Sequence, residues 1–172
     1  LVRRLLIIHH SPTRSMQLLS DQVRAGAGDE AIEGVEVVYC PALDFATGAA
    51  NHETILAADG YVLGTTANFG YMSGALKHMF DSTFLQIGGA LSDDGSGSGT
   101  PSGATSGRPF GLFVHGRYDT TGATRSVLSL TQALGWRQAA APLEVLGDLT
   151  PDSLSTGYEL GATLAALLSE AP

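Results

Sequence analysis

Short apolar runs alternate with amphipathic segments along most of this chain. The runs at 3–8, 35–40, 60–65 and 110–114 are rich in aliphatic and aromatic residues and predict β-strands. The first run ends in four consecutive apolar residues, which is typical of a strand covered on both faces, as in a parallel sheet. A weaker fifth strand is predicted near 142–146.

Helices are expected between these strands. In the segment 16–25, Met16, Leu19 and Val23 recur at helical spacing, and Ser15 is the N-cap candidate. The connection after the second strand, which Pro41 is expected to stop, holds at most a short helix before Ala58. Three further helices are predicted: one to about Ile87 after the cap Ser73, one over 123–134, and one over 151–169 after the cap Thr150.

A strand followed by a helix, repeated five times, predicts a parallel sheet with helices on both faces. Right-handed crossovers make this a doubly wound, three-layer α/β sandwich with five parallel strands. Ligands of such folds bind beyond the carboxyl ends of the strands, where the strand order reverses. This rule selects three loops, at 9–15, 66–72 and 115–122, as the candidate site.

Composition fits one globular domain over residues 1–172. The segment 88–107 is rich in Gly, Ser, Thr and Asp, and is predicted to be a flexible insertion within that domain. With 9 basic and 17 acidic residues, the net charge of −8 argues against nucleic acid or an anionic membrane as the main partner.

Apolar run length, cysteine content and histidine context narrow the class of protein further. The apolar run 5–8 is too short for a signal peptide or a membrane span, so a cytoplasmic location is expected. The single cysteine, Cys40, excludes an intramolecular disulfide and is interpreted as a core residue. His9 and His10 have no carboxylate or cysteine cluster nearby in sequence, so no metal site is predicted.

The first loop has the chemistry of a phosphate site. Ser11, Thr13 and Ser15 supply hydroxyls, Arg14 supplies a guanidinium, and the loop leads into a helix whose free amides and dipole favour an anion. An ordinary capped turn is the alternative interpretation, and the residues alone leave the two open. The loop has neither G-x-G-x-x-G nor a Gly-Lys-Ser/Thr sequence.

The other two loops suit a flat aromatic ligand. Phe69 and Tyr71 flank Gly70, which permits a positive φ, so a peptide group of this loop can turn toward the edge of a ring. The alternative is that both aromatic side chains fill the core. In the third loop, Tyr118 can stack on a ring and Arg117 can stabilise negative charge on it, although each residue alone is ordinary surface chemistry.

Two stretches of sequence carry a resemblance to a known family. Residues 5–15, LLIIHHSPTRS, and residues 58–81, ADGYVLGTTANFGYMSGALKHMFD, resemble the flavodoxin-like superfamily, in particular its NADPH-dependent FMN reductase and NAD(P)H:quinone oxidoreductase group. The order of elements agrees over 3–169. The resemblance implies the strand order 2-1-3-4-5, non-covalently bound FMN, NADPH or NADH as electron donor, and a homodimer or homotetramer. A phosphate loop with Pro12 and Arg14 and without glycine departs from the flavodoxin pattern.

The resemblance also assigns the ligand contacts. It implies that the phosphate of FMN lies at Ser11, Thr13, Arg14, Ser15 and Met16, that the isoalloxazine ring lies beside Thr66, Ala67, Asn68, Phe69 and Gly70, and that His115, Gly116, Arg117, Tyr118 and Asp119 cover the other edge of the ring. His115 is a candidate to hydrogen-bond the flavin or to protonate a quinone, with a packed histidine of no catalytic role as the alternative.

Three functions compete. The leading hypothesis is an FMN-dependent oxidoreductase that takes hydride from NAD(P)H and reduces a quinone, a flavin or another small-molecule acceptor. The second is an electron carrier of the flavodoxin type, whose acidity suits basic redox partners. The third, a phosphorylated receiver domain, needs acidic residues after the first strand, where this chain has His9 and His10.

Overall fold

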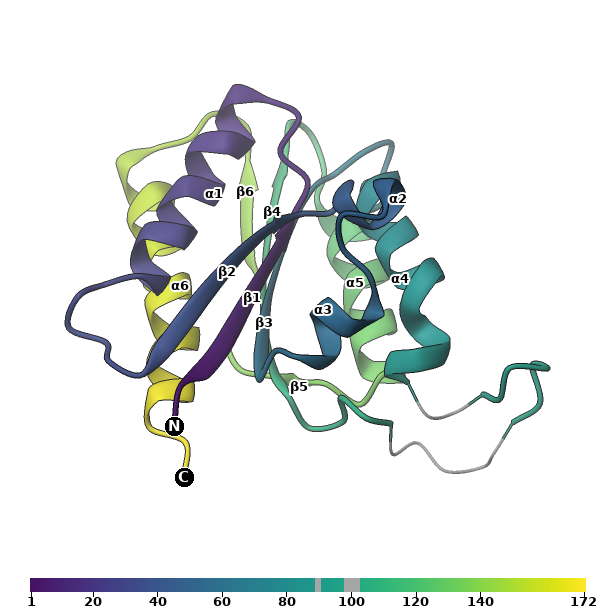
Figure 1. Ribbon diagram of the computed structural model, residues 1–172. Helices are drawn as coiled ribbons and strands as arrows, with labels where there is room; N and C mark the ends of the chain where they lie inside the picture. The colour runs from purple at the N-terminus through teal and green to yellow at the C-terminus, as the bar shows by residue number, and fades with distance from the viewer. Residues whose placement is uncertain (89–90, 98–102) are drawn as a thin grey trace.

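The sheet is parallel throughout and confirms the predicted strand order (Figure 1). The structure, a computed structural model, describes residues 1–88, 91–97 and 103–172. Its strands are β1 (Arg3–His9), β2 (Val35–Pro41), β3 (Gly60–Thr66), β4 (Pro109–Gly116), β5 (Arg137–Gln138) and β6 (Leu143–Leu146). They are arranged as β2-β1-β3-β4, with β5 and β6 both paired to β4.

The fifth position of the sheet differs from the prediction, because two short strands share it. β5 pairs with the start of β4, with Pro109 opposite Arg137. β6, the strand predicted near 142–146, pairs with the end of β4, from Phe113 to Gly116. The two segments are separated by residues 139–142, which end in Pro142, a residue without a backbone N–H to donate. The described sheet therefore has six strands instead of five.

Helices cover both faces of the sheet, as predicted (Figure 1). One face carries α1 (Arg14–Ala27) and α6 (Pro151–Ser169). The other carries α2 (Asp44–Thr47), α3 (His52–Leu56), α4 (Gly74–Ile87) and α5 (Thr121–Ala133). Among the described residues, no helix is long and apolar enough to cross a membrane.

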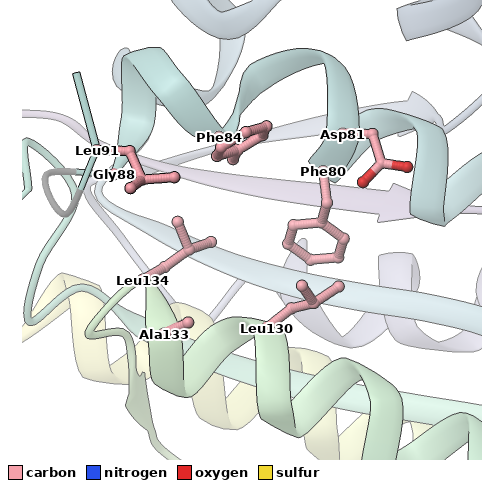
Figure 2. Close-up of a pocket in the computed structure, with 8 residues that line it drawn as sticks. All are labelled: Phe80, Asp81, Phe84, Gly88, Leu91, Leu130, Ala133 and Leu134. Atoms are coloured by element: carbon pink, nitrogen blue, oxygen red, sulfur yellow. The ribbon is translucent and has the colours of Figure 1, made fainter. Parts of the chain in front are cut away.

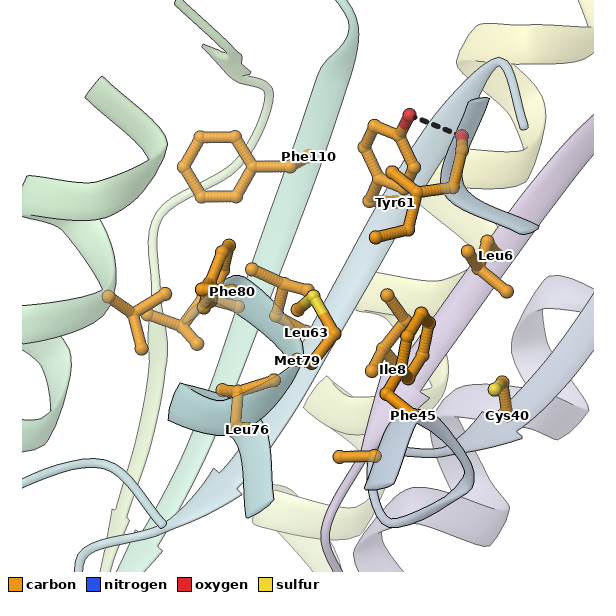
Figure 3. Packing of buried hydrophobic residues seen from close by; sticks show 14 of the residues in the cluster. Leu6, Ile8, Cys40, Phe45, Tyr61, Leu63, Leu76, Met79, Phe80 and Phe110 are labelled. Atoms are coloured by element: carbon orange, nitrogen blue, oxygen red, sulfur yellow. Dashed lines mark hydrogen bonds between the residues drawn. The ribbon is translucent and has the colours of Figure 1, made fainter. Parts of the chain in front are cut away.

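The continuous apolar run of β1 is explained by this double coverage. Leu5 and Ile7 belong to the core under α1 and α6, and Leu6 and Ile8 belong to the core on the opposite face (Figure 3). All four side chains are fully buried. Complete burial of such a side chain contributes roughly 1.5–3 kcal/mol, so each face of β1 is strongly held.

Two boundaries near the candidate site differ from the predictions. The N-cap of α1 is Thr13 and not Ser15, because Thr13 Oγ1 accepts the hydrogen bond from the Met16 amide at 3.2 Å. β2 includes Pro41 as its last residue, opposite His9 of β1. Proline is tolerated there because β2 lies at the edge of the sheet. The connection that follows holds two short helices, α2 and α3.

α1 and α6 contact each other backbone to backbone. A Cβ atom on Gly26 would lie 1.8 Å from the carbonyl oxygen of Tyr158, and one on Gly161 would lie 1.9 Å from that of Val23. No side chain fits at either position, so glycine is required for this approach. The position of α1, and of the loop that precedes it, therefore depends on α6.

The segment 88–107 is anchored at its end. Thr105 is fully buried, accepts a hydrogen bond from Trp136 Nε1 at 2.8 Å, and donates one to the Ile87 carbonyl at 2.8 Å. Trp136 itself stacks on Tyr61 in the core, with ring centroids 4.1 Å apart. The predicted flexible insertion includes residues 89–90 and 98–102, which lie outside the described residues.

Candidate functional site

The three predicted loops lie side by side at the carboxyl edge of the sheet (Figure 1). The His10 amide donates to the Gly64 carbonyl at 3.0 Å, which ties the first loop to β3. The Ala67 amide donates to the His115 carbonyl at 2.9 Å, which joins the second loop to the third. Residues far apart in sequence therefore form one continuous edge.

The β1–α1 loop presents donors at the N-terminus of a 14-residue helix. Arg14 and Ser15 occupy its first turn, where amides have no intrahelical acceptor. The Arg14 side chain is exposed, with no hydrogen bond or ion pair to any described residue. Met16 differs, because its side chain is fully buried and Thr13 accepts its amide. The donors that this loop offers a ligand therefore include the two amides, the Arg14 guanidinium and serine or threonine hydroxyls.

A buried histidine supports the same loop from below. His9 is 7% exposed, and its ring stacks on Tyr39 of β2 with centroids 4.1 Å apart. Its Nδ1 lies 2.7 Å from Ser11 Oγ, which lies 2.8 Å from Ser20 Oγ of α1. Burial, with a smaller contribution from His10, lowers the pKa of His9 to about 4, so the ring is neutral at pH 7.

Sequence reasoning considered His9 only as a metal ligand. No group of three or more His, Cys, Asp or Glu residues able to hold a metal lies in the part of the chain that the structure describes. The sequence signal that indicates a role for His9 is its position: it is a polar residue at the end of a buried strand, directly before the loop. Its contact with Tyr39 depends on the pairing of β1 with β2, which the sequence does not state.

The β3–α4 loop is a tight two-residue turn. The Asn68 amide donates to the Tyr71 carbonyl at 2.8 Å, and the Tyr71 amide donates to the Asn68 carbonyl at 3.0 Å. Phe69 and Gly70 form the turn with φ values of 52° and 76°, the combination of a type I′ turn. Phe69 is the only non-glycine residue with positive φ that the described backbone contains, so the turn is strained.

The aromatic side chains of this turn point outward. Phe69 is fully exposed and Tyr71 is 44% exposed, so neither fills the core. The base of the loop is firm, because Thr65 Oγ1 accepts from the Ser73 amide at 2.9 Å. Thr66 donates to Asn68 Oδ1 at 2.8 Å. A rigid base thus holds an exposed aromatic ring in a strained conformation.

The β4–α5 loop has several internal partners. His115 Nε2 lies 2.7 Å from the Gly147 carbonyl oxygen and donates to it, and Arg117 pairs with Asp148 at 2.8 Å. Asp119 Oδ1 accepts from the Thr121 amide at 2.9 Å, and this bond lowers the pKa of the Asp119 carboxyl. His115 and Arg117 hold the β4–α5 loop against the β6–α6 turn, whereas Asp119 caps the start of α5.

The other two predicted residues of this loop are placed differently. A Cβ atom on Gly116 would lie 3.0 Å from Ala67 Cβ, which keeps the second and third loops close. Tyr118 is 88% exposed and bonds to no described residue. With Phe69 and Tyr71, it completes a group of three exposed aromatic residues, here called the aromatic rim.

A partly open apolar pocket lies elsewhere. Figure 2 shows a cavity of about 190 Å³ between the C-terminal halves of α4 and α5, lined mainly by Phe80, Phe84, Leu130 and Leu134. Because both helices run antiparallel to the strands, their C-terminal halves lie toward the amino edge of the sheet. The one carboxylate there, Asp81, pairs with Lys77 at 2.6 Å, as their spacing on the helix predicts. This pocket is therefore not part of the candidate site.

Comparisons with known proteins agree on the fold. No family model and no curated protein matches the sequence. Among solved structures, a flavodoxin from the domain Archaea matches with a TM-score of 0.73 at 13% identity, over 96% of this chain and 98% of that one. Flavodoxin 1 from Bacillus cereus matches with a TM-score of 0.69 at 15% identity, over 94% and 96%.

A third similar structure is described as an oxidoreductase. It comes from Corynebacterium diphtheriae and matches with a TM-score of 0.67 at 14% identity, over 99% of each chain. These identities are low, so the likeness is one of fold. With the strand order β2-β1-β3-β4-β5 and helices on both faces, it shows that the chain has the flavodoxin-like α/β fold.

Proposed function

We propose that this protein binds FMN non-covalently at the carboxyl edge of its sheet and uses it in electron transfer. The observation that carries the proposal is the strained turn that exposes Phe69. A fully exposed phenylalanine at positive φ is unfavourable both for solvation and for the backbone. Such strain is typical of ligand sites, and a flat ring resting against Phe69 explains why it is kept.

The phosphate end of the ligand fits the β1–α1 loop. Two free amides, the dipole of α1 and the Arg14 side chain favour a terminal phosphate, with Ser11, Thr13 and Ser15 as hydroxyl partners. The loop is short and carries no dinucleotide fingerprint, which favours FMN over FAD. In the third loop, Tyr118 and the backbone of residues 116–119 are the proposed contacts, because His115, Arg117 and Asp119 already have partners.

The proposed reaction is NAD(P)H-dependent reduction of a quinone, a flavin or a similar small acceptor. When bound, FMN supplies a ring that accepts hydride from the nicotinamide donor and passes electrons to the acceptor. The protein holds the phosphate, orients the ring against the aromatic rim and leaves its reactive edge accessible. His115 is not proposed as a proton donor, because its Nε2 proton is held by the Gly147 carbonyl.

An electron carrier without its own substrate is the second candidate. The net charge of −8 favours it, because acidic surfaces suit docking to basic redox partners. The names of the similar structures, two flavodoxins and an oxidoreductase, lend support to both candidates. We further propose a cytoplasmic protein that assembles as a homodimer or homotetramer.

Two measurements test the proposal. Purified protein mixed with FMN should show a visible flavin spectrum that stays with the protein on desalting and is released by acid. Steady-state oxidation of NADPH and NADH with menadione as acceptor then separates the candidates, because a carrier gives no turnover without a reductase. Absence of FMN binding at saturating concentrations would refute the whole proposal, whereas binding without turnover favours the carrier.

A further inference from the structure

His9 is the least satisfied polar side chain near the candidate site. Its Nε2 is buried and has no hydrogen-bond partner among the described residues, whereas its Nδ1 lies 2.7 Å from Ser11 Oγ. Nothing in the proposed electron transfer uses this ring. A buried, unpaired nitrogen directly behind a ligand-binding loop needs an explanation, because such groups are uncommon in folded proteins.

The position of the ring proton follows from the partners. A neutral imidazole has one donor nitrogen and one acceptor nitrogen. A proton on Nε2 would leave a buried N–H without an acceptor, which is the rarer kind of unpaired group. A proton on Nδ1 instead donates to Ser11 Oγ. Burial keeps the pKa of His9 near 4, so the neutral form prevails at pH 7.

The next link is Ser20, a fully buried residue of α1. Its hydroxyl lies 2.8 Å from Ser11 Oγ, and either serine can donate this hydrogen bond. Ser20 also hydrogen-bonds the side chain of Tyr39. A hydroxyl oxygen accepts two hydrogen bonds and donates one. With His9 donating to Ser11 Oγ, the Ser11 proton points away from His9, and it is free for a ligand when Ser20 donates to Ser11 as well. Ser11 is half-buried, two residues before the N-cap of α1.

We propose that His9 is a positioning residue that holds Ser11 so that its hydroxyl donates to the phosphate of the ligand; this inference rests on the proposed binding of FMN. The stack of His9 on Tyr39 fixes the plane of the ring and hence the direction of its Nδ1–H. The arrangement pre-orients a donor before the anion arrives, which reduces the entropy lost on binding. A dianionic phosphate strengthens the bond further, because hydrogen bonds to charged groups are stronger than neutral ones.

Affinities for FMN and riboflavin, compared in one double-mutant cycle, test this proposal. His9→Phe keeps an aromatic ring against Tyr39 and removes the unpaired nitrogen, so the variant should fold. It should weaken FMN binding about 3- to 10-fold, the value of one neutral hydrogen bond, and leave riboflavin binding unchanged. Ser11→Ala should weaken FMN binding about 10-fold or more. The double variant should equal Ser11→Ala alone, because His9 acts only through Ser11.

Two further measurements separate positioning from a general structural role. His9→Asn places an amide donor near the position of Nδ1 and should restore much of the preference for FMN over riboflavin. Nitrogen-detected NMR of the ligand-free protein should find the proton on Nδ1. A proton on Nε2, additive losses in the double variant, an equal loss for riboflavin, or unchanged FMN affinity in His9→Phe would each overturn the inference.

These outcomes remain distinct from failure of the proposed function. If the unmodified protein binds no FMN, the proposed function is refuted and the inference falls with it. If it binds FMN and the His9 variants behave otherwise than expected, only the inference is refuted.

Discussion

Gly122→Ala is expected to displace the turn that carries Phe69 while leaving the β1–α1 loop in place. Gly122 is the second residue of α5, and the Gly70 carbonyl packs directly against it. A Cβ atom on residue 122 would lie 1.9 Å from that oxygen. Carbon and oxygen atoms in close contact lie about 3.3–3.6 Å apart. The carbonyl must therefore retreat by about 1.4 Å or more.

A displacement of this size should have a large effect on the rate of a reaction that depends on precise positioning, and a small effect on the stability of the fold. Misplacing reacting groups by about 1 Å can cost on the order of 100-fold in rate. Overpacking typically costs about 1–3 kcal/mol, and alanine in a helix regains about 0.5–1 kcal/mol relative to glycine. We therefore expect a net loss of stability below roughly 2.5 kcal/mol and a fall in NAD(P)H-dependent turnover of about 100-fold.

Titration with two ligands localises the effect. Because the turn is proposed to contact the ring and not the phosphate, FMN and riboflavin should lose affinity by the same factor, and the ratio of their dissociation constants should stay constant. Gly74→Ala is the matched control, since a Cβ atom there meets nothing within 4 Å. A folded Gly122→Ala protein with unchanged affinities and turnover would remove the turn from the site.

Three further outcomes are expected. Arg14→Ala should weaken FMN about 10- to 150-fold in calorimetry, the value of a charge-assisted hydrogen bond, and barely affect riboflavin; an equal loss for both ligands would mean that Arg14 acts through folding. Phe69→Asn should raise the free energy of unfolding by about 1 kcal/mol in thermal melts, because asparagine suits positive φ, yet weaken both flavins; unchanged flavin affinity would refute the ring contact. The pKa of His9 is lowered from 6.5 in the unfolded chain to about 4 in the folded protein, so the unfolded chain binds the proton first as the pH falls. The free energy of unfolding should therefore fall by about 3 kcal/mol from pH 7 to pH 4. His9→Phe should lose this part of the pH dependence, and an equal pH dependence in both proteins would refute the role of His9.

The sequence predicts those parts of the fold that rest on local hydrophobic pattern. Five strands and four long helices are found where the sequence pattern predicts them, and the strand order agrees with the one that the family resemblance implies. β5 was missed because Arg137 and Gln138 are polar and exposed, so no apolar pattern marks them. Its existence depends on pairing with β4, a contact that local sequence does not encode.

The loops of the candidate site were predicted from topology, whereas the state of their side chains was not. His115 and Arg117 bond to Gly147 and Asp148, about 30 residues further along, so their partners follow only from the folded sheet. The exposure of Phe69 depends on a type I′ turn in which phenylalanine is a poor choice, and propensity therefore argues against the conformation observed. Functional sites are where such local rules are expected to fail.

The close packing of α1 on α6 has a consequence for when the site can form during synthesis. The two helices are joined by glycine contacts, and Tyr158 of α6 donates a hydrogen bond to Asp29, just after the end of α1 and 129 positions earlier in the chain. At about 5–20 residues per second, the ribosome makes α1 roughly 6–26 s before the part of α6 that supports it. The β1–α1 loop is thus synthesised well before the helix on which its position depends. Nascent chains that lack α6 should be unable to retain a flavin, so a bound flavin would mark a chain synthesised through α6 and folded.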